Sequence, residues 1–264
     1  MSKSIIVGLD IGTTKVCAIV GTYNDHKKID IFGFGKAESD GVQRGVVQNI
    51  EKTVNAIRTA IHEAEKQSGV KIEIVHVGIA GEHIRSFQHK GIITLPSPDR
   101  EIVQEDLKRL YQEMHKLALQ PGDQIIHVLP QEYTVDHQHN IKDPVGMSGV
   151  RLEGNFHIIT GQIAAAKNIV KCVRKAGLEV ADIILEPLAS SKAALTEDEK
   201  EAGVALVDIG GGTTDIAIFE DKIIRHTAVI PFGGNIITED IKSGCSVMRQ
   251  QAEQLKVKFG SALA

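Results

Sequence analysis

The sequence of 264 residues has no tryptophan, only three cysteines and no block of basic residues. Its formal net charge is −4, so nothing in the charge favours nucleic-acid binding. Cys17, Cys172 and Cys245 each lie in an apolar segment, which predicts buried free thiols rather than disulfides or metal ligands. No apolar stretch approaches the roughly 20 residues that a membrane-spanning helix needs, and the first residues do not have the pattern of a signal peptide.

The motifs of several enzyme classes are also absent from the sequence. No Gly-x-x-x-x-Gly-Lys-Ser/Thr phosphate loop occurs, and residues 210–212 lack the Gly-x-Gly-x-x-Gly spacing of a dinucleotide fold. No Gly-x-Ser-x-Gly elbow or Cys/His nucleophile pair is present. His137 and His139 have no cysteines or carboxylates at ligand spacing, so surface histidines are favoured over a metal pair.

One motif, however, occurs twice. The segments Asp10-Ile-Gly-Thr-Thr-Lys15 and Asp208-Ile-Gly-Gly-Gly-Thr-Thr-Asp215 each lie between two short apolar runs. This pattern predicts a β-hairpin, because two strand-like runs are joined by a glycine-rich turn. Glycine lets successive N–H groups point into one concavity that can hold an anion, and the threonine hydroxyls add donors. A carboxylate at the mouth of such a loop is well placed to hold Mg²⁺ through water beside phosphate oxygens.

The strength of this prediction differs between the two motifs. Asp-Gly turns are common in ordinary hairpins, but three consecutive glycines lose much chain entropy on folding and a simple turn does not need them. Lys15 could contact phosphate or be a solvated strand residue. Glu186 ends an apolar run just before Pro187, where it could orient a water against a terminal phosphate or merely cap a helix or form an ion pair.

Apolar periodicity predicts the organisation of the chain. Strands are predicted at 5–9, 16–20 and 29–34, then a helix capped by Asn49 and closed by Gly69, then a strand at 72–79. In that helix, four residues at helical spacing predict one stripe packed on a sheet: Val54, Ile57, Ile61 and Ala64. We predict a first lobe made of residues 1–81 and 161–202.

The segment 82–160, here called the insertion, has a different character. It contains five of the seven prolines, a predicted helix over 104–119 and predicted strands at 91–95, 124–129, 132–136 and 155–159. We predict a small α+β subdomain. Residues 196–202 are expected to form an acidic connector, and the first-lobe strand pattern begins again at Val204. Residues 203–264 are therefore predicted to be the start of a second, incomplete lobe, and the chain to be a fragment.

The duplicated loops resemble those of the actin, heat-shock chaperone and hexokinase superfamily. Within it, the chain resembles the bacterial FtsA cell-division family from end to end, through the second glycine motif and the stretches 142–153, 168–180, 185–190, 231–241 and 252–260. The resemblance implies an α/β, actin-like ATPase fold of two duplicated ribonuclease-H-like lobes, each with a mixed sheet and flanking helices. The longer family members end in an amphipathic helix that lies on the membrane, and this chain contains no such helix.

The resemblance also implies the residues of an ATP site. Glu186 and Asp208 are expected to act in catalysis, and Asp10 and Asp208 to hold Mg²⁺ through water. The residues expected to bind nucleotide are Asp10, Gly12, Thr13, Thr14 and Lys15 in the first loop, Gly210, Gly211, Gly212, Thr213 and Thr214 in the second, Gly233 and Gly234 in the following turn, and Glu253 and Lys256 at the nucleoside. ATP hydrolysis is expected to be slow at most.

The role that the resemblance implies is to link FtsZ filaments to the membrane. The expected location is the cytoplasmic face of the inner cell membrane at the division septum, and the expected partners are FtsZ, further copies of the protein in filaments, and other septal proteins that contact 82–160. Two alternatives stay open: a small-molecule kinase or phosphatase of the same superfamily, and an actin-like ATPase of pilus assembly. All three readings require Asp10 and Asp208 to face each other across one cleft.

Overall fold

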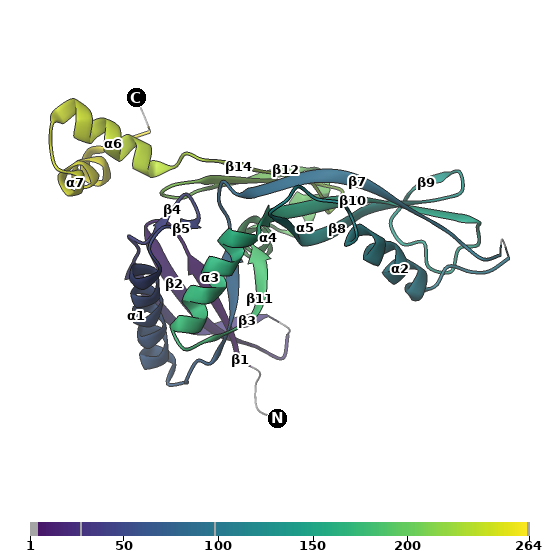
Figure 1. Ribbon diagram of the computed structural model, residues 1–264, viewed down its shortest axis with the longest axis horizontal. Helices are drawn as coiled ribbons and strands as arrows, with labels where there is room; N and C mark the ends of the chain where they lie inside the picture. Colours follow the sequence, from purple (N-terminus) through teal and green to yellow (C-terminus); the bar gives the residue numbers. More distant parts are fainter. Residues whose placement is uncertain (1–4, 27, 98, 263–264) are drawn as a thin grey trace.

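The computed structural model describes residues 5–26, 28–97 and 99–262, which form two lobes and the insertion (Figure 1). The first lobe is built on a five-stranded mixed sheet in the order β11-β6-β1-β2-β3. Strands β1, β6 and β11 are parallel, whereas β2 is antiparallel to both of its neighbours. The strand bounds are β1 Ile5–Ile11, β2 Lys15–Tyr23, β3 Ile29–Glu38, β6 Ile74–Ile79 and β11 Glu179–Leu185.

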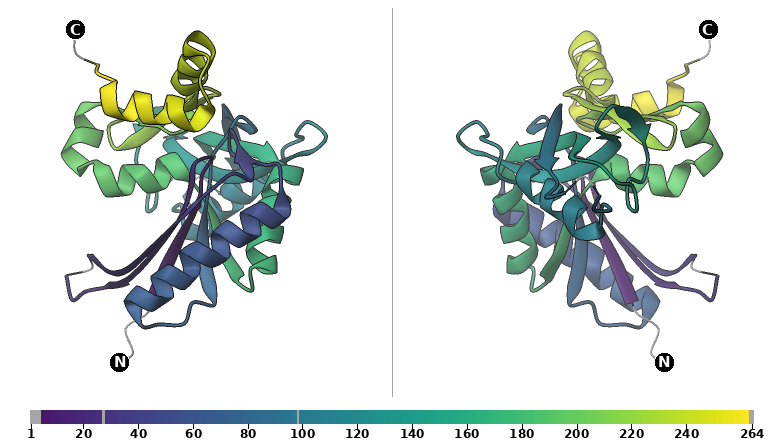
Figure 2. Two further views of the ribbon diagram at one scale, coloured as in Figure 1. Left: turned by 90° about the vertical axis from the view of Figure 1, so that its left-hand side faces the viewer. Right: turned by 90° about the vertical axis from the view of Figure 1, so that its right-hand side faces the viewer.

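Helix α1 (Ile50–Ser68) lies along one face of this sheet (Figure 2). The predicted caps are confirmed: the Asn49 side chain accepts a hydrogen bond from the Lys52 N–H, and Gly69 ends the helix with a φ of 70°. The predicted stripe is also confirmed, since all four of its residues are buried. The helix packs closely on β3, because a Cβ on Gly35 would lie 1.9 Å from the Ala60 carbonyl oxygen.

Two further elements complete the first lobe. Helix α3 (Ile163–Lys175) packs against α1 and adds Ile169 and Val173 to the core of the lobe. A short hairpin of β4 (Val42–Gln43) and β5 (Val46–Val47) follows β3. The core therefore lies between the sheet and this pair of helices.

The insertion is a four-stranded antiparallel sheet in the order β7-β10-β8-β9, with one helix, α2 (Gln104–Met114), on one face. Leu110 and Met114 of α2 lie over Gly91 and Gly154, where a Cβ would come within 3.0 Å of their side chains. The strand bounds are β7 Ile84–Thr94, β8 Asp123–Val135, β9 Gln138–Ile141 and β10 Arg151–Gln162.

Several expectations for the insertion were wrong in extent. The helix ends at Met114 rather than Leu119, because Met114 is its last fully buried residue and the following turn bonds back over three residues. The two strands predicted at 124–129 and 132–136 are one strand, β8. Pro130 does not divide them, since a β-bulge next to it, at Gln131, absorbs the irregularity.

The second lobe begins with three antiparallel strands, β12 (Val204–Ile209), β13 (Thr214–Glu220) and β14 (Ile223–Ile230). Helices α4 (Glu186–Ala194) and α5 (Glu197–Ala202) lead into it from the first lobe. The expected acidic connector at 196–202 is helical: Thr196 and Glu199 form a capping box that starts α5.

Helices α6 (Gly234–Cys245) and α7 (Arg249–Phe259) pack on each other at one end of the molecule, far from α2 (Figure 1). Cys17 and Cys172 are buried, as predicted, but Cys245 is exposed at the end of α6. No helix in the described part of the chain is long and apolar enough to cross a membrane.

Candidate functional site

Both glycine motifs form β-hairpins with the same turn. In the first hairpin (residues 10–15), the Gly12 N–H donates to the Lys15 carbonyl at 3.0 Å, and Asp10 pairs across the strands with Cys17. In the second hairpin (residues 208–215), the Gly210 N–H donates to the Thr213 carbonyl at 2.9 Å. The predicted hairpins are thus confirmed.

The tips of the two hairpins meet. A Cβ on Gly211 would lie 2.3 Å from Thr14 Cγ2, and one on Gly212 would lie 2.8 Å from Thr13 Oγ1. Positions 211 and 212 favour glycine, because a side chain at either one would collide with a threonine of the first hairpin. The consecutive glycines of the second motif therefore serve a close approach between the lobes.

Four carboxylates, those of Asp10, Glu186, Asp208 and Asp215, gather beside these tips and influence one another. Burial raises the pKa of the Asp10 carboxyl above 3.8; the Lys15 charge opposes this rise and Asp208 of the other lobe adds to it. The charge of Asp208, in the second lobe, therefore acts on Asp10 in the first.

Glu186 begins α4 and lies over Gly78 of β6, where a Cβ would be 3.0 Å from Glu186 Oε1. Burial raises the pKa of its carboxyl well above 4.5, and the charges of the three aspartates raise it further. A half-buried carboxyl among three others is typical of a functional site rather than of an ordinary helix cap.

Asp215 is the residue that the sequence reasoning missed, although it closes the second motif. It lies opposite Asp208 in the β12–β13 ladder and is only 6% exposed. Burial raises its pKa to about 6, with the Thr213 hydroxyl opposing and Asp208 adding to the rise. Its Oδ1 is buried with no hydrogen-bond partner, so the site has an acceptor to offer. Ser190, also missed, donates to Asp208 Oδ2 at 3.3 Å.

Gly233 and Gly234 lie beneath the second hairpin. The Gly234 N–H donates to the Gly210 carbonyl at 2.9 Å, and the Asn235 N–H donates to the Gly211 carbonyl at 2.8 Å. A Cβ on Gly233 would lie 2.4 Å from the Gly210 carbonyl oxygen, so this position also requires glycine.

Glu253 and Lys256 of α7 are linked to the second hairpin through Gly234. Lys256 Nζ donates to the Gly234 carbonyl at 3.1 Å and to Glu253 Oε2 at 2.7 Å, and Thr238 also donates to Glu253. Among the described residues, no hydrogen bond or ion pair joins this pair to the first hairpin. The structure therefore places these two residues beside the second hairpin alone.

The other predicted residues surround the tips. Lys15 is exposed at the start of β2, Thr13 is half-buried, and Thr214 donates through its hydroxyl to the Phe232 carbonyl at 2.8 Å. Within the described ranges, no three His, Cys, Asp or Glu side chains are arranged to ligate a metal directly. A cation held here would need water or phosphate oxygens among its ligands.

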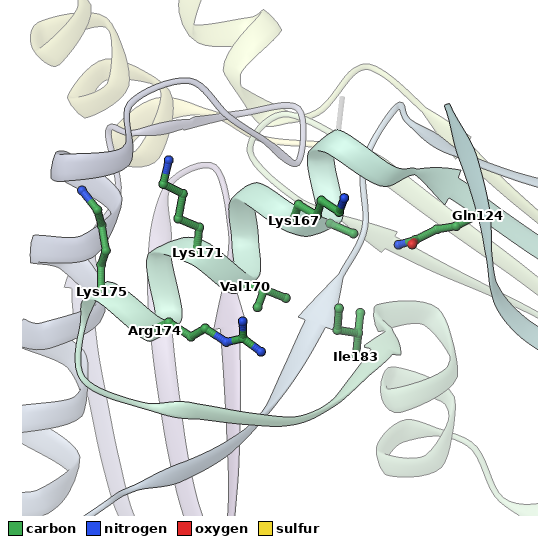
Figure 3. Close-up of a pocket in the computed structure, with 8 residues that line it drawn as sticks. Gln124, Lys167, Val170, Lys171, Arg174, Lys175 and Ile183 are labelled. Carbon is green, nitrogen blue, oxygen red and sulfur yellow. The ribbon is translucent and has the colours of Figure 1, made fainter. Parts of the chain in front are cut away.

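A hollow of about 700 Å³ lies elsewhere, along α3 (Figure 3). Lys167, Lys171 and Arg174 line it together with Gln124 and Ile183, and none of the predicted nucleotide residues does. It is separate from the carboxylate cluster.

Comparison with known proteins places the chain in a family. A family model described as the SHS2 domain inserted in FtsA matches residues 81–160, and one described as cell division protein FtsA matches residues 205–264. The cell division protein FtsA of Pseudomonas aeruginosa is 49% identical over 263 residues, which is 100% of this chain and 63% of that protein. The chain belongs to the FtsA family.

Other comparisons agree with this membership. The FtsA protein of Neisseria meningitidis is 45% identical over 254 residues, 96% of this chain and 61% of that protein. The chain thus spans less than two thirds of the length of the FtsA relatives it matches. An Hsp70 protein model also matches residues 164–223.

Among solved structures, a chain of a PilM-PilN type IV pilus biogenesis complex aligns with a TM-score of 0.73 at 14% identity, covering 97% of this chain and 70% of that one. At this identity the likeness shows the fold alone. Together with the Hsp70 match, it confirms the predicted actin-like fold of this chain.

Proposed function

We propose that the region where the two hairpins meet binds ATP with Mg²⁺, and that the complete protein is an actin-like cell-division protein of the septal ring. One observation carries the proposal: carboxylates from both lobes gather where two glycine hairpins of the same geometry meet. Such an accumulation of negative charge is unfavourable in itself, and a bound cation would relieve it.

The residues present suit a magnesium polyphosphate. The Oδ1 of Asp215 is buried without a hydrogen-bond partner, and burial and neighbouring carboxylates raise the pKa values of Asp10, Glu186 and Asp215. A cation bound beside these groups would favour their charged forms. Asp10 and Asp208 would hold Mg²⁺ through water, since direct ligation by three side chains is not available in the described residues. When bound, Mg²⁺ would neutralise phosphate charge.

The hairpins would bind the phosphates through backbone N–H groups at their tips. The N–H groups of Gly12 and Gly210 close the turns, so this task falls to the residues that follow each of them. Glu186 would orient a water against the terminal phosphate, and burial together with the three aspartates raises the pKa of its carboxyl. We propose that hydrolysis is slow at most. In this proposal the nucleotide is mainly structural and holds the two lobes together.

The cellular part of the proposal rests on family membership, since the relatives are named cell division proteins. We propose that the complete protein links FtsZ filaments to the cytoplasmic face of the inner membrane, forms filaments with its own copies and contacts other septal proteins through the insertion. Membrane attachment would come from a C-terminal helix of the complete protein.

Calorimetric titration of ATP with and without Mg²⁺ tests the nucleotide site. Asp10→Asn and Asp208→Asn should each weaken Mg²⁺-dependent binding by about tenfold or more, since each removes a charge that faces the cation. Asp25→Asn is the matched control, because Asp25 is exposed in the β2–β3 turn. Equal affinity in all four proteins, or no binding by the wild type, would reject the site.

The cellular role needs a complete family member. Purified protein should recruit FtsZ filaments to lipid vesicles in the presence of ATP, and deletion of its C-terminal helix should abolish recruitment. A complete protein that binds ATP but neither polymerises nor recruits FtsZ would contradict this part while leaving the nucleotide site intact.

A further inference from the structure

The insertion sheet has two unlike faces. One is apolar and covered by α2, as described above. Polar side chains of β7, β8 and β10 instead meet β14 of the second lobe, which runs alongside β7 and β10 (Figure 1). We call this set of polar contacts the β14 contact.

The β14 contact consists mainly of side chains that bond the backbone of β14. Ser86 Oγ donates to the Thr227 carbonyl at 2.9 Å, and Gln88 Nε2 donates to the Arg225 carbonyl at 3.2 Å. Gln131 Nε2 donates to the Ile224 carbonyl at 2.7 Å. Three carbonyl groups of a strand at the edge of its sheet are thus satisfied by the insertion.

Two β-bulges create this geometry. Gln131 is the extra residue of the bulge in β8, and Arg225 is the extra residue of the bulge in β14. A bulge redirects a side chain relative to a regular strand, which lets the buried Gln131 side chain reach across to the second lobe. Arg225 Nη1 also lies 3.8 Å from Glu132 Oε2 of the insertion.

His157 completes the β14 contact. Its Nε2 lies 3.0 Å from Thr227 Oγ1, so both the hydroxyl and the carbonyl of Thr227 are held by the insertion. His157 is only 1% exposed, and burial and, to a smaller extent, the nearby His226 lower its pKa to about 4. The imidazole is therefore neutral at neutral pH and can stay at this polar interface without a counter-ion.

From Thr227 the strand leads directly to the proposed nucleotide site. Val229 and Ile230 pair with Asp215 and Thr214 of β13. The chain then passes Phe232, whose carbonyl accepts from Thr214, and reaches the Gly234 N–H that bonds the second hairpin. Only one residue separates Thr227 from Val229, the ladder partner of Asp215.

We propose that the insertion positions the second hairpin: Ser86, Gln88, Gln131 and His157 hold β14 and thereby fix the geometry of the proposed phosphate loop. These are positioning residues, because none of them touches the carboxylates or the hairpin tips. The proposal rests on the proposed function only in calling that loop a nucleotide site. It predicts that ATP binding and the arrangement of the insertion influence each other.

Hydrogen exchange of the nucleotide-free chain tests this inference. Gln131→Ala and Gln88→Ala should each speed the exchange of the Gly234 and Asn235 amides by about three- to tenfold, the effect of losing one hydrogen bond. Gln112→Ala is the matched control, since Gln112 lies exposed on α2 within the same insertion. First-lobe amides should not change in any variant.

Gln88 is exposed, so its variant should fold even if loss of the buried Gln131 proves too disruptive. Faster exchange confined to β14, with Gly234 and Asn235 unchanged, would overturn the proposal, because the insertion would then only stabilise the strand. An equal change in the Gln112 variant, or a uniform rise across the chain, would also overturn it.

ATP titration of the same proteins separates this inference from the proposed function. If the wild type binds ATP, both variants should bind it about three- to tenfold more weakly and the control should not. If the wild type does not bind ATP, the proposed function fails, whereas the exchange data still decide whether the insertion positions the loop.

Discussion

The two hairpins have nearly the same turn but very different surroundings. The first is part of a five-stranded sheet whose core includes residues of α1 and α3. The second is part of a three-stranded sheet whose own buried apolar cluster comprises Ala217, Phe219 and Ile224. In this second sheet Val207 and Ile209 are 51% and 69% exposed.

The comparison shows that the motif determines the shape of the turn, whereas the lobe around it determines its stability. Glycine placement sets the turn, which is why both hairpins close with the same hydrogen bond. Stability comes from the apolar area that each lobe buries, which is far smaller in the second lobe. The second hairpin therefore depends on its neighbours, namely the insertion, α4 and α5.

Truncating one buried isoleucine in each lobe should give the largest difference in stability between the two lobes. Ile57→Ala removes a fully buried side chain of the first-lobe core and should lower the free energy of unfolding by about 3–4 kcal/mol. Ile224→Ala acts on the small second-lobe cluster and should cost about 2 kcal/mol, because fewer neighbours lose contacts. Chemical denaturation measures both values.

Hydrogen exchange on the same two proteins shows where the effect lies. Ile57→Ala should speed exchange throughout the chain, whereas Ile224→Ala should affect only β12, β13, β14 and the Gly234 and Asn235 amides that follow β14. If Ile224→Ala destabilised the first lobe equally, the two lobes would be one cooperative unit and the contrast drawn here would be wrong.

The carboxylates predict a second difference, in pH dependence. The pKa of Asp215 is raised from 3.8 to about 6, so its contribution to stability is complete below pH 3.8 and is lost as the pH rises through 6. The shift corresponds to about 3 kcal/mol at most. Asp215→Asn should therefore stabilise the nucleotide-free chain at pH 8 by up to about 3 kcal/mol and have little effect at pH 4.

Asp10→Asn is the matched variant in the first hairpin. Its gain at pH 8 should be smaller, because the Lys15 charge already favours the Asp10 carboxylate whereas the Asp215 carboxylate has only the Thr213 hydroxyl. Thermal unfolding between pH 4 and 8 measures both. A stability of Asp215→Asn that fell with pH as steeply as that of the wild type would show that Asp215 is not the titrating group.

The fold was predictable where local signals agree. The α1 caps and stripe were predicted correctly because capping residues and helical spacing point to the same element. The extent of β8 was not, since a proline favours a break and only pairing with β10 shows that a bulge accommodates it. The exposure of Cys245 likewise depends on what α6 packs against, which its own sequence does not specify.

The candidate site was also predictable only where local sequence patterns indicate it. Residues within the two motifs could be chosen from glycine spacing and carboxylates, yet Asp215 was left out because its importance comes from burial, not from its residue type. The position of Glu186 over Gly78 depends on a contact between segments more than 100 residues apart. The roles assigned to these residues stay predictions until nucleotide binding is measured.

The contact between the hairpin tips gives a smaller, reciprocal test. Gly211→Ala would place its Cβ 2.3 Å from Thr14 Cγ2, so the loops should move apart, at a cost of about 1–2 kcal/mol and about tenfold in ATP affinity. Adding Thr14→Ser removes that methyl group and should restore most of the loss. Gly8→Ala is the control, since a Cβ there meets nothing within 4 Å. A double variant no better than Gly211→Ala would show that the tips are not coupled.

The smallest expected effect is a shift in the titration of one aspartate in each hairpin, caused by substituting the residue that ends its turn. Thr213→Ala removes the hydroxyl that lowers the pKa of Asp215, and Lys15→Gln removes the charge that lowers the pKa of Asp10. Each should raise the titration midpoint of the aspartate in its own hairpin by less than about one pH unit, as followed by carboxyl NMR shifts. The other aspartate should change less, because no direct interaction links it to the substituted residue. Equal shifts at both would mean that the carboxylates titrate as one group, and that the hairpins differ in support but not in charge.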